Sequence, residues 1–63
     1  MCLSTVYNGA IADDRMLMSN VQQILCQGDT VTLTDILERQ ITVEGHIEMA
    51  DLVNGKVIIV PKS

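Results

Sequence analysis

Short alternating blocks of apolar and polar residues run along the whole chain, a pattern typical of β-strands. Residues 30–34 alternate valine and leucine with threonine, as a strand with one buried face does. Residues 40–44 repeat the pattern, with Ile41 and Val43 on the face that we expect to be buried and a threonine on the exposed face. We therefore predict strands over both segments, joined by a turn at 35–39.

Turn-forming dipeptides divide the rest of the chain into further apolar segments. Asn8-Gly9 ends the first predicted strand, 2–7, and a loop follows it over 10–14. Ser19-Asn20 separates the apolar residues 15–18 from 21–27. We favour a strand for 21–27, although its glutamines also fit a turn of helix. Gly28-Asp29 predicts a hairpin into the strand at 30–34.

The segment after Gly45, which we expect to relax a corner, predicts a bent strand. Ile47 and Met49 share one face, whereas Leu52 falls on the other. A bulge near Ala50-Asp51 would turn all three side chains inward.

Asn54-Gly55 predicts a two-residue type I′ turn between 51–53 and the last strand, 56–60. That last strand is apolar on both faces between Val57 and Val60. Its outer face therefore needs a cover, and a second subunit is the simplest one.

About five to six short strands with tight turns and no convincing helix predict an all-β fold, a small SH3-like antiparallel barrel that forms one domain over residues 1–63. A single core below roughly 70 to 80 residues seldom supplies more than about 3 to 5 kcal/mol. We therefore expect a homodimer, with an edge strand that pairs across a two-fold axis.

Composition narrows the classes of function. Eight Asp and Glu against four Lys and Arg give a net charge of −4, which disfavours a nucleic-acid partner. Tyr7 is the only aromatic residue, so the core must be aliphatic. The N-terminus lacks the pattern of a signal peptide, and no apolar stretch approaches the length of a membrane span. We expect a soluble, cytoplasmic protein with reduced cysteines and no membrane partner.

Residues for catalysis are scarce, and we do not expect an enzyme. The single histidine, His46, lies on the polar face of its strand, where we expect it to be exposed. Asp13 and Asp14 are adjacent in a loop and read as a solvated turn rather than as a site for a hard cation.

Four sulfur-containing side chains are expected to serve in packing. Met16, Met18 and Met49 are possible thioether ligands, but methionine is also an ordinary gap filler in an aliphatic core. Cys26 lies within an apolar block and reads as a small buried hydrophobic residue.

Cys2 differs because of its place beside the start of the chain. The amine of Met1, the amide nitrogen between Met1 and Cys2, and the Cys2 thiolate can close small chelate rings on one metal ion. If Met1 is removed, the Cys2 amine and thiolate remain. Nitrogen and sulfur donors in a square plane favour nickel or copper. The amine and thiol must lose protons first, so binding should weaken as the pH falls.

The sequence as a whole resembles the CooT family of small nickel-binding proteins. The resemblance covers residues 1–60 and rests on the Met1-Cys2-Leu3 start, the segment 29–35, the Val43-Glu44-Gly45 corner with Ile47 beyond it, and the closing hairpin 51–59. One departure is the turn Leu37-Glu38-Arg39, which lacks the glycine expected there in relatives.

The resemblance implies a homodimeric SH3-like barrel that binds nickel(II) through Cys2. It also implies a metallochaperone or nickel store for the maturation of a nickel enzyme such as carbon monoxide dehydrogenase, which would be its client. Two alternatives stay open. One is a non-metal interaction module that binds RNA or protein along an edge strand. The other is a redox module that uses Cys2 and Cys26 as a pair.

Overall fold

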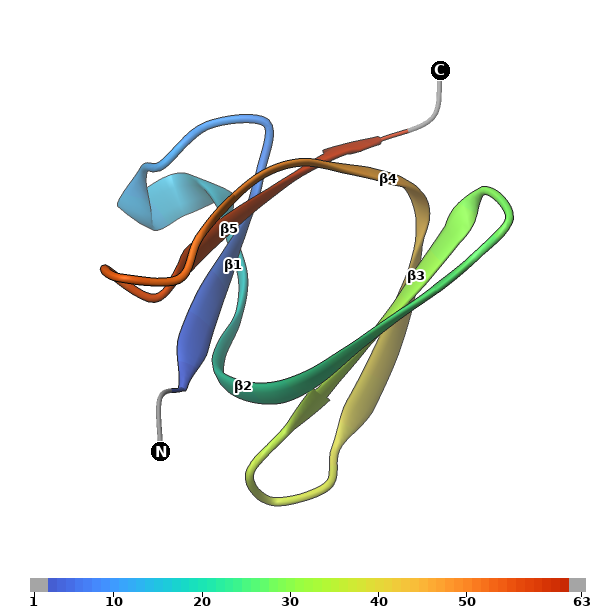
Figure 1. Ribbon diagram of the computed structural model, residues 1–63, viewed down its shortest axis with the longest axis horizontal. Coiled ribbons are helices and arrows are strands. Elements are labelled where there is room, and N and C mark those ends of the chain that lie inside the picture. The colour runs from blue at the N-terminus through green and yellow to red at the C-terminus, as the bar shows by residue number, and fades with distance from the viewer. Residues whose placement is uncertain (1–2, 62–63) are drawn as a thin grey trace.

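The computed structural model describes residues 3–61, and within them five strands close into a barrel (Figure 1). The strands are β1 (Ser4–Asn8), β2 (Met16–Gln27), β3 (Thr30–Asp35), β4 (Gln40–Asp51) and β5 (Lys56–Pro61). A single turn of 3₁₀ helix, η1 (Asp13–Arg15), precedes β2. The all-β class, the strand number and the hairpin after Gln27 are confirmed.

The ring closes where β1 meets β5, and these two strands are parallel. Their register runs from Thr5 opposite Lys56 to Asn8 opposite Ile59. The other four pairings are antiparallel. The predicted antiparallel arrangement is confirmed for these four pairings. The closing pair is parallel because successive strands reverse direction, so that the first and fifth strands point the same way. Every strand has two neighbours in this ring, but within residues 3–61 each half of β2 and of β4 pairs on one side only. A homodimer that pairs along such an edge stays a prediction.

Two long strands, β2 and β4, bend so that each pairs with two other strands (Figure 1). The first half of β2 pairs with β1 and the second half with β3. Asn20 lies at the bend with a φ of 54°, and the register shifts between Val21 and Gln23. The predicted interruption at Ser19-Asn20 is therefore a bend inside one continuous strand.

Gly45 lies inside β4, where the strand changes partner from β3 to β5, so the predicted corner is a bend within one strand. Its amide donates a hydrogen bond of 2.7 Å to the carbonyl of Asp29, and its Cα partner in β5 is Pro61. A Cβ at this position would collide with the carbonyl oxygen of Val60 and lie 2.9 Å from the Cα of Pro61. Glycine is required here because β4 and β5 approach more closely than a side chain permits.

We predict that Gly45→Ala destabilises the protein by about 2–4 kcal/mol, because two backbone segments must separate to admit the methyl group. Gly9→Ala is the matched control, since Gly9 has a φ of 82° and nothing within 4 Å of an added Cβ. It should cost only the left-handed backbone penalty of about 1–2 kcal/mol. Urea denaturation measures both variants. Equal losses would show that the strands do not crowd at Gly45.

The core is aliphatic, as the composition predicts. Six side chains are almost fully buried: Val6, Val21, Val31, Leu33, Val57 and Ile59. They come from β1, β2, β3 and β5, and the inward residues of β4, Ile41 and Val43, are partly buried against them. Thr42 is exposed, as predicted.

The end of β4 differs from the expectation. The register shift lies between Ile47 and Met49, not at Ala50-Asp51. Leu52 does not turn inward but is 72% exposed, because β4 has already ended and the residue belongs to the following loop.

The β4–β5 loop has four residues, 52–55, and the predicted two-residue turn was wrong. Gly55 has a φ of 68°, whereas Asn54 has no positive φ, which a type I′ turn would require. The carboxylate of Asp51 closes the loop instead. It accepts hydrogen bonds from the Asn54 backbone amide at 3.1 Å and from Asn54 Nδ2 at 2.7 Å.

The β3–β4 turn is the turn that lacks the glycine expected from the family resemblance. Glu38 has a φ of 64°, in the left-handed region that glycine occupies without steric cost. The Asp35 carbonyl accepts the Glu38 amide at 3.0 Å, and the Asp35 amide donates to the Arg39 carbonyl at 3.0 Å. The turn therefore forms without glycine, at the cost of strain in one residue.

We predict that Glu38→Gly stabilises the protein by about 0.5–1 kcal/mol, because relief of the left-handed strain exceeds the added freedom of the unfolded chain. Asn20→Gly is the control, since asparagine already tolerates this region and should gain less. Thermal unfolding measures the difference. A lower melting temperature for Glu38→Gly than for the parent would contradict the strain argument.

Candidate functional site

The predicted metal ligands, Cys2 and Met1, lie outside the described residues, 3–61. The structure therefore describes the surroundings of the site from Leu3 onward. Leu3 is 36% exposed and precedes β1 directly. Whether Cys2 and its neighbouring nitrogens bind a metal stays a prediction.

The start of β1 is held by the β4–β5 loop. The amide of Thr5 donates a hydrogen bond of 2.8 Å to the carbonyl of Gly55. A Cβ built on Gly55 would lie 3.0 Å from the carbonyl oxygen of Leu3. The loop backbone is thus packed against the residue that follows Cys2 in the chain.

Asp51 keeps its negative charge at this loop. The side-chain hydrogen bond from Asn54 lowers the pKa of the Asp51 carboxyl below its ordinary value, and the backbone amide of Asn54 adds to the effect. Partial burial opposes the shift without reversing it. The ionised carboxylate therefore stays bound to Asn54 over the neutral pH range.

The polar side chains that we did not expect to be catalytic are exposed, as predicted. His46 is exposed on β4, as predicted. Asp13 and Asp14 are exposed in η1, which confirms the solvated turn.

Cys26 is exposed, and the prediction of a buried residue was wrong. It lies near the end of β2, opposite Val31, in a hairpin that projects past the body of the ring (Figure 1). An apolar neighbourhood in the sequence does not bury a side chain so close to the tip of a hairpin.

Met16, Met18 and Met49 differ in how far they are buried. Met18 is partly buried against the core, as predicted, and Met49 is half-buried outside the core cluster. Met16 is 51% exposed, so core packing was the wrong prediction for it. Met16 lies opposite Tyr7, whose neighbour Val6 takes the inward position.

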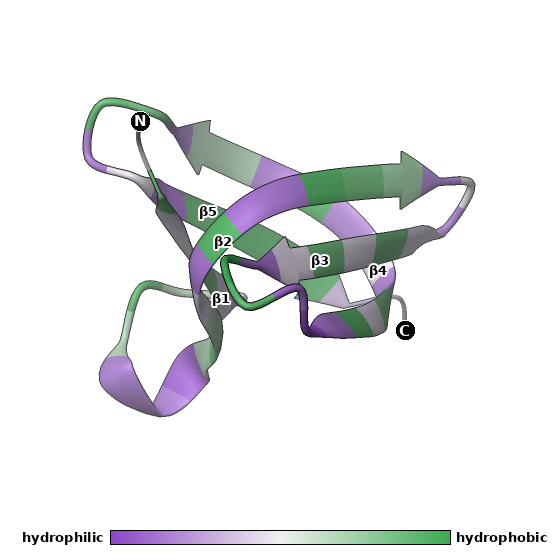
Figure 2. Ribbon diagram, turned by 90° about the horizontal axis from the view of Figure 1, so that it is seen from below, coloured by the Kyte–Doolittle hydropathy of each residue, from purple (hydrophilic) through white to green (hydrophobic). Residues whose placement is uncertain are grey.

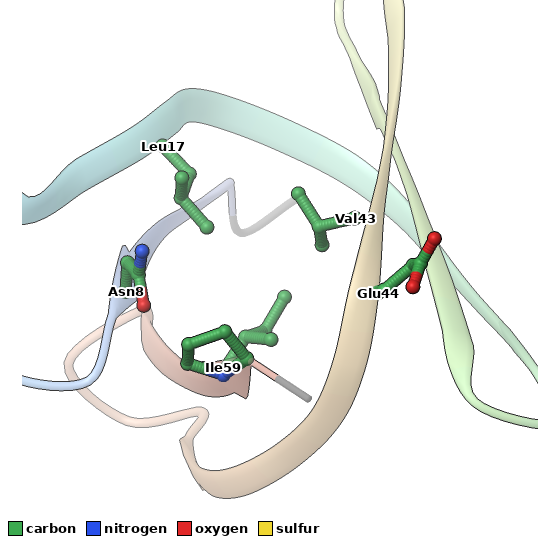
Figure 3. Close-up of a pocket in the computed structure, with 6 residues that line it drawn as sticks. Asn8, Leu17, Val43, Glu44 and Ile59 are labelled. Atoms are coloured by element: carbon green, nitrogen blue, oxygen red, sulfur yellow. The ribbon is translucent and has the colours of Figure 1, made fainter. Parts of the chain in front are cut away.

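One end of the barrel holds a cavity of about 240 Å³ (Figure 3). Its lining residues are Asn8, Leu17, Val43, Glu44, Ile59 and Pro61. Figure 3 shows the side chains of Leu17 and Val43 pointing into the space and that of Glu44 on the opposite side of β4. The interior is therefore apolar, with few groups for chemistry.

A second hollow of about 350 Å³ lies over β2 and the β3–β4 turn. Met16, Met18 and Ile41 line it together with Asp35 and Arg39. Asp35 is 2% exposed, and its Oδ2 accepts a 2.7 Å ion-pair hydrogen bond from Arg39 Nε. Its Oδ1 accepts the backbone amides of Leu37 and Arg39, each at 2.9 Å.

Sequence reasoning missed the role of Asp35. Burial tends to raise the pKa of its carboxyl, but hydrogen bonds from the Arg39 backbone and side chain and from the Leu37 amide outweigh burial and lower it. The available signal was an aspartate at the end of a predicted strand, because aspartate in a turn often accepts the backbone amide two residues further on in an Asx turn. The carboxylate stabilises the β3–β4 turn.

We predict that Asp35→Asn lowers the melting temperature at neutral pH by at least about 5 °C, because the amide presents an N–H group to Arg39 Nε. The folded protein holds the Asp35 proton less tightly than the unfolded chain does. The stabilisation by the Asp35 carboxylate is therefore fully present above the ordinary aspartate pKa of 3.8. It is lost as the pH falls through the lowered pKa of the folded protein.

Thermal unfolding from neutral to strongly acidic pH should thus give a flatter acid profile for Asp35→Asn than for the parent. Asp13→Asn, at an exposed carboxylate, is the charge-matched control. Parallel acid profiles for the parent and Asp35→Asn would contradict the proposed role of the carboxylate.

Within residues 3–61 there is no group of three or more histidine, cysteine, aspartate or glutamate side chains that could hold a metal ion. Within the same residues, no helix has the length and apolar content needed to cross a membrane.

Comparison with known proteins gives one finding. A family model described as "CO dehydrogenase accessory protein CooT" matches residues 1–60 of the 63-residue chain. A comparison with curated proteins finds no match. The family match covers β1 to β4 and all but the last residue of β5, and it includes the two residues that precede the described ones.

Proposed function

The chain belongs to the CooT family of CO dehydrogenase accessory proteins, and from this premise we propose that it binds nickel(II) as cargo for delivery to a nickel enzyme. The observation that carries the proposal is the cysteine at position 2 within a match that begins at residue 1. The role is one of binding and transfer rather than of catalysis.

The donor set suits the ion. The Cys2 thiolate, the amide nitrogen between Met1 and Cys2 and the terminal amine offer one sulfur and up to two nitrogens to a single metal. Late divalent ions of the first transition row prefer such donors, and nickel accepts them in a plane. The cargo would be held without a pocket, because adjacent atoms of one short segment form the chelate.

We also propose a homodimer, for two reasons. Two N-termini at one ion would double the donor count, so the stoichiometry would be one nickel per dimer; a site complete within one chain would give one per chain. The barrel, which we assign to the SH3-like type, also has an apolar row on its outer surface. Met16, Tyr7, Ile58 and Met49 occupy successive register positions across β2, β1, β5 and β4.

This outer row is the uncovered side of β5 that the sequence indicates. Tyr7, Ile58 and Met49 are half-buried and Met16 is exposed. A homodimer that covers the row would bury apolar area by packing of sheet faces, without an edge strand. We propose this face for the dimer and the cytoplasm for the protein, where the Cys2 thiol would stay reduced.

We predict that Cys2→Ser lowers nickel affinity at least about 100-fold, because a hydroxyl does not replace a thiolate as a ligand for this ion. Cys26→Ser is the matched control and should bind nickel like the parent, since Cys26 is exposed on the β2–β3 hairpin and is not part of the proposed donor set. Isothermal titration with nickel chloride measures both variants. Affinity should also fall as the pH drops below about 8, where the amine and thiol regain their protons.

An unchanged affinity in Cys2→Ser would refute the proposed site. An equal loss in Cys2→Ser and Cys26→Ser would instead favour the pair of cysteines as the functional unit.

A further inference from the structure

The chain has three asparagines, and the residue that follows each one determines how readily its side chain can react with the backbone. An asparagine loses its side-chain amide when the next backbone nitrogen attacks the side-chain carbonyl carbon. Val21 follows Asn20, and its branched side chain crowds that nitrogen. Glycine follows both Asn8 and Asn54, and it has no Cβ to hinder the attack. The two Asn-Gly pairs are therefore the candidates for this reaction.

The fold protects the first Asn-Gly pair. Asn8 is the last residue of β1, where its register partner is Ile59 of β5. The attacking nitrogen would be that of Gly9, whose N–H donates a hydrogen bond of 2.9 Å to the carbonyl of Ile59. This nitrogen attacks only after it has lost its proton, so β1 must first open from β5.

The second Asn-Gly pair lies in the β4–β5 loop, outside the strands. Within residues 3–61, no hydrogen bond holds the N–H of Gly55. One hydrogen bond holds the side chain of Asn54, from Nδ2 to Asp51 Oδ2 at 2.7 Å, and it is exposed to solvent. The nucleophile is therefore free, and the amide that it would attack is held by a single contact for which water competes.

The neighbouring side chains leave this loop uncovered. Leu52 is 72% and Val53 95% exposed. In Figure 2 the tip of the loop is green and projects between the end of β4 and the start of β5. Exposed loops with few contacts open more readily than paired strands do. The fold thus separates two pairs that the sequence alone would treat alike.

We propose that Asn54 is a site of spontaneous covalent modification, at which asparagine is converted into aspartate and isoaspartate. The Gly55 nitrogen gives its proton to solvent and bonds to the side-chain carbonyl carbon of Asn54. The bond from that carbon to Nδ2 breaks, and Nδ2 takes up a proton and leaves as ammonia, so that a cyclic imide remains. Water then opens the imide. Cleavage at the former side-chain carbonyl gives aspartate, and cleavage at the backbone carbonyl gives isoaspartate.

The product places a carboxylate beside an existing one. Nδ2 of Asn54 donates to Asp51 Oδ2, and replacing this donor by an anionic oxygen sets two negative charges against each other. Isoaspartate also adds a methylene group to the backbone before Gly55, whose carbonyl accepts the Thr5 amide at 2.8 Å. The modification should therefore loosen the loop where it contacts the start of β1.

Peptide mapping of the full chain during storage at mildly alkaline pH tests the proposal. Trypsin cleaves after Arg15, Arg39 and Lys56, so each asparagine lies in a peptide of its own: 1–15, 16–39 or 40–56. Mass spectrometry detects the exchange of –NH2 for –OH, and chromatography separates aspartate from isoaspartate. A sample digested at the start corrects for reaction during digestion. The chain unfolded in urea is the control for local sequence, because both Asn-Gly pairs are free there.

In the folded protein we expect peptide 40–56 to deamidate at least about 10-fold faster than peptide 1–15, because Gly9 is released only when β1 opens from β5. In urea the two rates should be similar. Asn54→Gln should abolish the product in 40–56, since glutamine must close a larger ring. Equal rates for the two peptides in the folded protein, or a faster reaction in 1–15, would overturn the proposal.

The effect on the loop is measured with Asn54→Asp, which reproduces one product. Its melting temperature should be about 3–6 °C below that of the parent. Asn20→Asp adds the same charge at another exposed asparagine and should change the melting temperature less. Equal melting temperatures for Asn54→Asp and the parent would contradict the loosening of the loop.

Discussion

The parallel pairing of β1 with β5 is the constraint on which the rest of the structure depends. It joins the first and last strands of a five-stranded sheet and so closes the ring within residues 3–61. It also brings Val6 of β1 together with Val57 and Ile59 of β5 in a core of six nearly buried side chains. Without it, the sheet would be an open meander with little core of its own.

The same pairing determines the surroundings of the N-terminus. Because Thr5 lies opposite Lys56, the loop before Lys56 must lie beside the residues before Thr5. Gly55 meets Leu3 for this reason, and Asp51 and Asn54 stiffen the loop from its other side. From Leu3 onward, the start of the chain is therefore packed against this loop.

The alternation of valine, leucine and isoleucine with polar residues predicted the strands and most of the core. Successive side chains of a strand point to opposite faces, so a strand with one buried face has an apolar residue at every second position. It did not predict how long strands bend. Ser19-Asn20 and Gly45 look like chain breaks, yet they let β2 and β4 curve and pair with two partners each. Closure by a parallel pair is a property of the whole ring, and no local pattern contains it.

The candidate site was predictable in part. Cys2 stood out by its position, and the family match includes it. Gly55 and Leu3 are 52 positions apart in the sequence but pack together in the fold. The sequence therefore indicated that Gly55 is a turn residue but not that it contacts the start of β1. Likewise, the β3–β4 turn looked doubtful without a glycine, but Glu38 takes the left-handed conformation while the Asp35 carboxylate holds the amides around it.

Native mass spectrometry of the intact protein with nickel chloride tests the central claim most directly, because one spectrum reports the number of chains, the number of ions and the presence of Met1. The account predicts a dimer that retains nickel, and loss of the metal adduct when Cys2 is alkylated while alkylation of Cys26 alone leaves the adduct in place. A spectrum in which the protein takes up no nickel, or keeps it after Cys2 is blocked, would contradict the account.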